Sequence, residues 1–402
     1  MKKKVLIFSL QYYPYVGGAE VALKELTDRL GEVYEFHMIT AWYDRSLPQQ
    51  EYVGSVLVHR IGLATMHPAI GDLRRLPLHL NKYLYQMLAY WEARKLHRIH
   101  DYTLVWAMMA HATGIPAGLF KRAVPHVPYV LTLQEGDPLA HIERTMRPVW
   151  PLFVQGFLRA DRVQAISTFL GAWATRMGFR GTPDIIPNGV DVVRFAAPIA
   201  EADIEHARRT LGKTEGDVYL ITTSRLVHKN GIDTVVRALA LLPEHVIFLV
   251  YGIGPDEAKL RTLAQELGVE HRVRFMGQAT HGELPVLLRA SDIFVRPSRS
   301  EGMGNSFIEA MAAGIPVIAT QEGGISDFLF DAVRNPDKTT TGWAVDVDAP
   351  VQIKDAVERI IEDAQTTQKV CEQAKNLAIT TYNWDLVAQD MSSVFAAVGQ
   401  VQ

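Results

Sequence analysis

The chain has 402 residues, of which 48% are hydrophobic and 21% are charged, and its formal net charge is −3. This length predicts about two or three globular domains, and the slight negative charge gives no support to nucleic-acid binding. The single cysteine, Cys371, excludes an internal disulfide and fits a reducing compartment.

The first half of the chain alternates short apolar strands with helices. Its first apolar run, residues 5–9, follows three lysines but is short and lacks a cleavage site, so we expect a buried strand and not a signal peptide. Further strands are predicted at residues 34–40, 56–61, 104–107, 129–133, 162–166 and 184–186. Helices are predicted at residues 19–30 and 73–100, with a break at Pro77, and from Gly114 onward. Apolar strands that alternate with helices are typical of a parallel sheet covered on both faces.

Residues 185–195 interrupt this alternation with the sequence Ile-Ile-Pro-Asn-Gly-Val-Asp-Val-Val-Arg-Phe. Because Asn-Gly favours positive φ and therefore a turn, we place a domain boundary here. The expected units are a first domain of residues 1–195, a second of residues 196–383, and a terminal helical segment of residues 384–402. The second domain repeats the plan of the first. Its strands are predicted at residues 218–223, 246–251, 273–275, 293–295 and 317–319, and its helices at residues 201–212, 231–242, 255–268, 284–290 and 306–313.

Residues 301–319 form the most informative motif. An apolar strand leads into a glycine-containing loop, a helix and a second apolar strand, which predicts a βαβ unit. Glu301 on the loop and Glu309 in the helix should both lie at the carboxyl end of the strand, where doubly wound sheets bind ligands. Such carboxylates can accept hydrogen bonds from sugar and ribose hydroxyls, while the free amides of the helix start suit a phosphate. The alternative is a solvated loop glutamate and a glutamate favoured by the helix dipole.

This motif resembles the Glu-x7-Glu motif of the family-4 retaining glycosyltransferases, which have the GT-B fold. That resemblance implies an α/β protein in which two Rossmann-like, doubly wound parallel-sheet domains face each other across a cleft, and a last helix that crosses back to the first domain. Four further segments match the family in order along nearly the whole chain: Gly17-Gly18-Ala19-Glu20, Pro187-Asn188-Gly189-Val190-Asp191, the loop at Arg225, and Gly252-Ile253-Gly254-Pro255.

The family implies a role for each matching residue. Glu301 would contact hydroxyls of the donor sugar, and Glu309 would hold the ribose. Arg225 and Lys229 would stabilise the leaving diphosphate, so that neither a metal ion nor a cofactor is needed. The family's lysine position holds Asn230 here, so Lys229 is assigned one residue early, and a solvated loop lysine is the alternative. The other implied donor-binding residues are Gly17, Gly18, Gly252, Gly254, Arg274, Gly302, Met303, Gly304 and Asn305.

The acceptor side departs from the family pattern. Many relatives carry a histidine after the strand that is predicted here at residues 129–133, whereas this chain has Gln134-Glu135-Gly136-Asp137. Gln134 can bond a sugar hydroxyl but exchanges no proton at neutral pH, and Glu135 and Asp137 can orient an acceptor. His111 is either a compensating catalytic group or a structural residue.

The expected function is transfer of a hexose-type sugar, with retention, from a nucleoside diphosphate sugar to a glycan, a lipid-linked or a small-molecule acceptor. Gln134 and Asn230 also allow a protein that binds a sugar nucleotide without transferring it, as a sensor or inactive partner. A third option is an enzyme of the same fold that hydrolyses or isomerises the sugar nucleotide. The sequence names neither the base nor the sugar.

Residues 72–100 are rich in cations. They contain two carboxylates and six basic residues interleaved with Leu, Tyr and Trp: Arg74, Arg75, Lys82, Arg94, Lys95 and Arg98. No apolar run of the chain approaches the roughly 20 residues that span a bilayer, so we expect a cytoplasmic protein. A basic amphipathic stretch can lie on an anionic membrane and present a lipid acceptor, which would make the contact peripheral. The alternative is a helix packed on the sheet with a solvated basic face.

Overall fold

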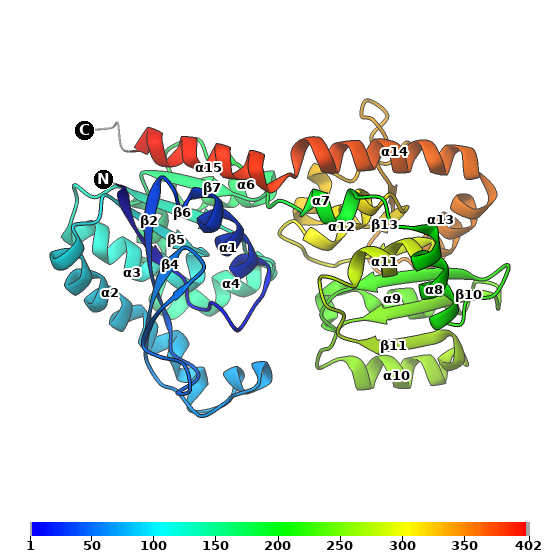
Figure 1. The fold of residues 1–402 in the computed structure, drawn as a ribbon, viewed down its shortest axis with the longest axis horizontal. Coiled ribbons are helices and arrows are strands. Elements are labelled where there is room, and N and C mark those ends of the chain that lie inside the picture. Colours follow the sequence, from blue (N-terminus) through cyan, green and yellow to red (C-terminus); the bar gives the residue numbers. More distant parts are fainter. Residues whose placement is uncertain (1, 399–402) are drawn as a thin grey trace. The chain divides into compact units, whose positions relative to one another are not determined.

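The computed structural model of the protein describes residues 2–398, and Figure 1 shows its two α/β units. The first unit contains the chain up to Asn188 together with the helix that begins at Trp384, and the second contains Gly189–Asn383. Both are built around mainly parallel sheets, as the alternation of strands and helices predicts.

The sheet of the first unit has the order β3-β4-β2-β1-β5-β6-β7-β8. All neighbours are parallel except β3 and β4, which form an antiparallel hairpin that the sequence analysis did not identify. The strands are β1 (Lys3–Phe8), β2 (Tyr34–Ala41), β3 (Gln50–Val53), β4 (Val56–Ile61), β5 (Leu104–Met108), β6 (Tyr129–Leu133), β7 (Arg162–Ala165) and β8 (Asp184–Ile185).

The helices of the first unit cover its sheet. They are α1 (Gly18–Leu30), α2 (Asn81–His100), α3 (Ala110–Ala123), α4 (Leu139–Met146), α5 (Trp150–Leu158), α6 (Thr168–Arg176) and α15 (Trp384–Val398), with short 3₁₀ turns η1 (Ile70–Arg74), η2 (Leu78–Leu80) and η3 (Arg147–Val149). The predicted helix of residues 73–100 is thus a long helix preceded by two short turns. The predicted helix at Gly114 begins earlier, at Ala110.

The terminal helix α15 belongs to the core of the first unit. Phe395 packs edge-on against Trp106 of β5 and Tyr34 of β2, with ring centroids 5.2 and 5.5 Å apart. Its first residue, Trp384, is buried in the same cluster as α1 and the central strands. Burial of these aromatic rings attaches the end of the chain to the unit that contains its beginning.

The second unit has a six-stranded, fully parallel sheet in the order β11-β10-β9-β12-β13-β14. Its strands are β9 (Val218–Thr223), β10 (Val246–Tyr251), β11 (Val273–Gly277), β12 (Ile293–Arg296), β13 (Val317–Ala319) and β14 (Trp343–Ala344). Its helices are α7 (Val192–Ala196), α8 (Glu201–Thr210), α9 (Ile232–Leu239), α10 (Glu257–Glu266), α11 (Leu284–Ala290), α12 (Asn305–Ala313), α13 (Pro350–Glu362) and α14 (Ala364–Thr381), with 3₁₀ turns η4 (His228–Asn230), η5 (Glu270–Arg272) and η6 (Gly323–Asp327).

The division between the units falls at Asn188, earlier than the boundary expected near residue 195. The reason is local packing of the short helix α7. It contacts α12 and α14, and the carbonyl of its buried Phe195 accepts a hydrogen bond of 3.1 Å from Arg289. The residues after the Asn-Gly turn therefore belong to the second unit.

Candidate functional site

The loops at the carboxyl edge of the second sheet fit together because two glycines lack side chains. A Cβ atom on Gly252, whose φ is +137°, would lie 1.8 Å from the carbonyl oxygen of Ser224. A Cβ on Gly254 would lie 2.2 Å from that of Leu226. The amide of Leu226 donates to the carbonyl of Ile253 at 3.0 Å. The loops after β9 and β10 are therefore held in backbone contact, which only glycine permits.

Two more glycines join the loop after β12 to its neighbours. Gly231 has φ +68°, and a Cβ there would lie 2.1 Å from the carbonyl oxygen of Pro297. Gly323 has φ +61°, and a Cβ there would lie 2.0 Å from the carbonyl oxygen of Glu301. Four loops thus meet at one edge of the sheet, the position at which doubly wound sheets bind ligands. Gly323 lies in the loop that follows β13.

Glu301 is fixed by a buried arginine that the sequence analysis missed. Arg296, the last residue of β12, donates from Nη2 to Glu301 Oε2 at 2.8 Å and from Nη1 to the hydroxyl of Ser306 at 2.7 Å. The other oxygen of Glu301 accepts from the amide of Gly302 at 3.0 Å. The guanidinium also lies 4.0 Å from the ring centroid of Phe307. The sequence does contain a signal for Arg296, because an arginine at the end of an apolar strand is unusual and indicates a buried charge with a partner.

Glu309 is a buried carboxyl, only 9% exposed, in the first turns of α12. Burial raises its pKa to about 7, against the opposing effect of the Arg296 charge. Within residues 2–398 we find no hydrogen-bond donor to this carboxyl. A buried acceptor of this kind is expected to bind a ligand hydroxyl, because unsatisfied buried polar groups are costly.

We expect Glu309 to make stability depend on pH. Its pKa of about 7 lies above the ordinary 4.5, so between these values the folded protein binds the proton more tightly than the unfolded chain. The free energy of unfolding should therefore fall as pH rises through this window. Glu309→Gln should remove that loss and make the ligand-free protein more stable at about pH 8, by on the order of 2–3 kcal/mol. Melting curves at several pH values test this, and an equal difference at about pH 5 would contradict it.

Asn230, which stands where the family has a lysine, is a structural residue of the loop after β9. Asn230 is buried, and its Nδ2 donates to the carbonyl of Arg225 at 2.6 Å. The carbonyl of Lys229 accepts from the amide of Arg299 at 2.7 Å, and the Arg299 guanidinium in turn bonds both oxygens of Asp233, at 2.9 and 2.7 Å. The side chain of Arg225 is exposed, and its charge helps to lower the pKa of Arg296, which burial lowers most. Arg225 therefore lies near the Glu301 site.

The start of α12 carries the remaining predicted residues of this loop. Gly304 has φ +92°, and a Cβ on it would lie 2.5 Å from the ring of Phe307. Met303 is buried, and Asn305 is the first residue of the helix. Arg274 is not part of this group. It lies near the amino end of β11, where it donates to the Tyr219 hydroxyl at 2.9 Å and to the carbonyl of Leu211.

The first unit carries its own glycine-led helix start. Gly17 and Gly18 begin α1, and a Cβ on Gly18 would meet no atom within 4 Å. The amide of Gly17 donates to the carboxylate of Glu20 at 2.7 Å, so an anion already occupies one of the terminal donors. The backbone at Gly18 therefore has room for an approaching ligand, and the ligand role predicted for this helix start stays a prediction.

Of the four acceptor candidates, three follow β6 and His111 lies on α3. Gln134 and Asn188 exchange hydrogen bonds of 2.9 and 3.2 Å. Glu135 is buried and its Oε1 lies 3.3 Å from Nδ1 of His111, while Oε2 is buried without a partner. The side chain of His111 is 36% exposed, so Glu135 can act on an acceptor only through His111. Asp137 is exposed.

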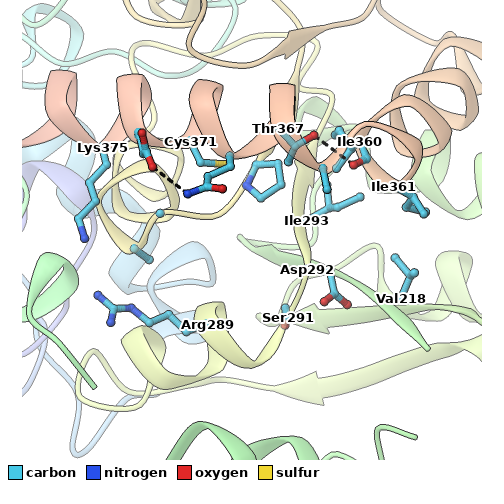
Figure 2. Close-up of a pocket in the computed structure, with 16 residues that line it drawn as sticks. Val218, Arg289, Ser291, Asp292, Ile293, Ile360, Ile361, Thr367, Cys371 and Lys375 are labelled. Carbon is cyan, nitrogen blue, oxygen red and sulfur yellow. Dashed lines mark hydrogen bonds between the residues drawn. The ribbon is translucent and has the colours of Figure 1, made fainter. Parts of the chain in front are cut away.

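A cavity of about 670 Å³ lies at the amino edge of the second sheet (Figure 2). Glu301, by contrast, follows the carboxyl end of β12. The cavity is lined by the amino ends of β9 and β12 and by α14, including Asp292 and Cys371. Asp292 is bonded by Lys213 at 2.6 Å, and burial raises the pKa of the Cys371 thiol to about 12. Asp292 is therefore already paired, and the Cys371 thiol is not a reactive thiolate.

Comparison with known proteins identifies the chain. Residues 16–194 match the family model of Glycosyltransferase Family 4, and residues 203–377 match that of glycosyl transferases group 1. Each half of the chain therefore matches a glycosyltransferase model. The chain belongs to the family-4-like glycosyltransferases with the GT-B fold, as its motifs predicted.

Individual relatives agree with this assignment. An uncharacterized glycosyltransferase of Methanocaldococcus jannaschii is 25% identical over 98% of this chain and 97% of its own length. A GDP-mannose-dependent phosphatidylinositol monomannoside mannosyltransferase of Mycobacterium tuberculosis is 31% identical over 58% of this chain and 60% of its own length. The structure of Anabaena HepE in complex with UDP-glucose is similar with a TM-score of 0.76, at 22% identity over 98% of this chain and 99% of its own. The last similarity shows the fold alone.

Proposed function

We propose that the protein transfers a hexose-type sugar from a nucleoside diphosphate sugar to an acceptor with retention of configuration and without a metal ion. The observation that carries the proposal is the pair of carboxyl groups on the loop and helix after β12. The Glu301 carboxylate accepts a hydrogen bond of 2.8 Å from Arg296, and Glu309 is a buried carboxyl whose oxygens can accept hydrogen bonds from a ligand. Glu301 would receive hydroxyls of the sugar, and Glu309 those of the ribose.

The donor class is supported by the relatives. The tuberculosis relative is named for GDP-mannose, and the Anabaena structure contains UDP-glucose. Both compounds are nucleoside diphosphate sugars, and they differ in base and in sugar. For this chain we propose the shared class, with Gly252, Gly254 and the Met303–Asn305 segment around the nucleotide, and a glycan, lipid-linked or small molecule as acceptor.

The proposed chemistry needs stabilisation of a leaving diphosphate. The bond between the sugar carbon and the diphosphate oxygen breaks, and the acceptor oxygen bonds to the same face of that carbon. The leaving phosphate takes the acceptor proton, so no separate base is required. Arg225 and Lys229 supply the positive charge, which favours the transition state over the ground state. His111, with Glu135 behind it, is the acceptor-side group that can orient the incoming hydroxyl.

A sensor that binds a sugar nucleotide without transferring it is the second candidate. Asn230 and Gln134, the two departures from the family pattern, are the residues that suggest it. Asn230 donates a hydrogen bond to the Arg225 carbonyl, so an asparagine at this position is compatible with a loop that binds the diphosphate.

Thermal-shift screening of nucleotide sugars should identify the donor. Release of free nucleoside diphosphate that increases on adding acceptor supports transfer, release without acceptor supports hydrolysis, and binding without release supports a sensor.

We expect donor binding and turnover to be independent of divalent metal. The reason is that Arg225 and Lys229 provide the cations that a metal would otherwise provide at the diphosphate. Activity should be unchanged after treatment with excess chelator and after adding back Mg²⁺ or Mn²⁺. Loss of turnover with the chelator, restored by either metal, would refute the metal-independent part of the proposal.

A further inference from the structure

The outer face of α2 is apolar where the sequence had allowed a solvated basic face. Six large apolar residues of this face are exposed, and Trp91, Tyr83 and Met87 are 62%, 61% and 52% exposed. They recur at the three- and four-residue spacing that places side chains on one side of a helix. We call this set the α2 face: Leu80 at the end of η2, and Tyr83, Leu84, Met87, Leu88 and Trp91 of α2.

The opposite side of α2 is fully used by the fold. Tyr85, Ala89 and Ala93 are buried, and the hydroxyl of Tyr85 donates to the carbonyl of Ile39 in β2 at 2.9 Å. Asn81 holds the helix start, with Nδ2 donating to the carbonyl of Leu63 at 2.7 Å. Figure 1 shows α2 at the rim of the first unit, next to α3. The α2 face is therefore not needed for packing of the core, and an exposed apolar surface of this kind indicates a binding partner.

Cations border the α2 face on both sides. Arg94, Lys95 and Arg98 follow it in the last turns of the helix, and Arg74 and Arg75 precede it. The segment 72–100 holds six basic residues and two carboxylates, in a chain whose formal net charge is −3. The two carboxylates are both paired, since Glu92 accepts from Lys95 and Asp72 from Arg75, each at 3.0 Å.

We propose that the α2 face is a membrane-docking surface that binds an anionic lipid bilayer. Apolar side chains would enter the boundary between headgroups and acyl chains while the flanking cations contact anionic headgroups, as interfacial amphipathic helices do. A second copy of the chain would fit poorly, because two such faces would bring their cations together. Within residues 2–398 no helix is long and apolar enough to cross a membrane, and the docking proposed is peripheral. It does not depend on the transferase reaction.

Vesicle sedimentation of the full chain, without donor or acceptor, tests the proposal. Vesicles of phosphatidylcholine and phosphatidylglycerol in equal parts should pellet the protein, and vesicles of phosphatidylcholine alone should not. Raising ionic strength from about 0.1 M to about 1 M should weaken the binding, because the Debye length falls from about 10 Å to about 3 Å. Failure to bind the anionic vesicles, or equal binding to both kinds, would overturn the proposal.

Two variants, one of apolar and one of basic residues, locate the surface. The triple variant Tyr83→Ser, Met87→Ser and Trp91→Ser should lower partitioning about tenfold or more, since it removes most of the inserted apolar area. The double variant Arg94→Glu and Arg98→Glu should lower it by at least about tenfold. Melting curves check that both fold.

Matched controls come from equally exposed positions of the second unit. Val333→Ser with Val351→Ser, and Lys259→Glu, should leave partitioning unchanged. Undiminished binding of both α2 variants would overturn the proposal. So would a dimer in sedimentation equilibrium that dissociates in the triple variant without vesicle binding, since it would assign the α2 face to a second copy. Donor binding by these variants should stay normal.

Discussion

Glu301→Gln is expected to lower kcat by about ten- to a hundredfold while leaving nucleoside diphosphate affinity nearly unchanged. The reason is that Glu301 is assigned to the transferred sugar, which the free nucleotide lacks. A charge-assisted bond to a sugar hydroxyl that strengthens in the transition state affects kcat and kcat/KM together. Calorimetry with the nucleotide and steady-state kinetics with the donor supply both measurements.

The structure adds a condition to this experiment. Glu301 is the ion-pair partner of the buried Arg296, so the neutral glutamine removes the counter-charge that is hydrogen-bonded to that guanidinium. Breaking a buried pair costs roughly 3–5 kcal/mol of stability, which the equal shape of glutamine does not prevent. We therefore expect a lower melting temperature. Unchanged nucleotide affinity then serves as the control that the second unit is folded when kcat is measured.

Glu309→Gln is the matched comparison. Glu309 is assigned to the ribose, which donor and product nucleotide share, so its loss should weaken both equally. It should also raise, not lower, stability near neutral pH, because burial disfavours the ionised carboxyl. An equal loss of nucleotide affinity in both variants would refute the division of roles. Normal turnover in both would remove the main support for the proposed mechanism.

The sequence predicted the elements whose signals are local. Most strands of both sheets are short apolar runs, unlike the polar edge strand β3, which was missed. Gly252, Gly254 and Gly304 identify loops that the structure places at the second sheet's carboxyl edge. Its predictions for Glu301 and Glu309 rest on a spacing that puts one on the loop and one on α12. Such features follow from neighbouring residues alone, because strand length and turn chemistry are set within a few positions.

The features that the sequence missed depend on contacts between distant segments. Arg299 reaches Asp233 across 66 positions, and no local pattern indicates that pair. Asn230 was compared with a phosphate-binding lysine, whereas its buried amide supports the Arg225 carbonyl. The exposure of Trp91 could not be predicted either, since an apolar residue on a helix is ordinarily expected to pack in a core. Burial and pairing are properties of the folded chain, and these required coordinates.

Arg225→Ala is expected to weaken nucleoside diphosphate and donor alike by about ten- to a hundredfold. A charge-assisted contact to phosphate is worth roughly 1.5–3 kcal/mol, and an arginine fork binds phosphate through two donors. Arg225 is exposed and bears no structural contact through its guanidinium among the described residues, so its loss should not affect folding. Arg237→Ala, at an exposed position of α9, is the matched control and should leave affinity unchanged.

Lys229→Ala and Asn230→Ala then decide how the loop works. Lys229→Ala should resemble Arg225→Ala if its ammonium contacts the diphosphate. Asn230→Ala should lower stability by about 0.5–1.5 kcal/mol, because the Arg225 carbonyl loses one of its two donors and keeps the amide of Val227. It should weaken nucleotide binding only through the displaced loop. Salt dependence separates the two cases, because direct contacts to phosphate weaken as ionic strength rises. The nucleotide affinity of Arg225→Ala and Lys229→Ala should therefore depend less on salt than that of the parent protein. Asn230→Ala should keep the parent's salt dependence. A strong salt-independent loss in Asn230→Ala, with Lys229→Ala harmless, would mean that position 230 and not 229 faces the diphosphate.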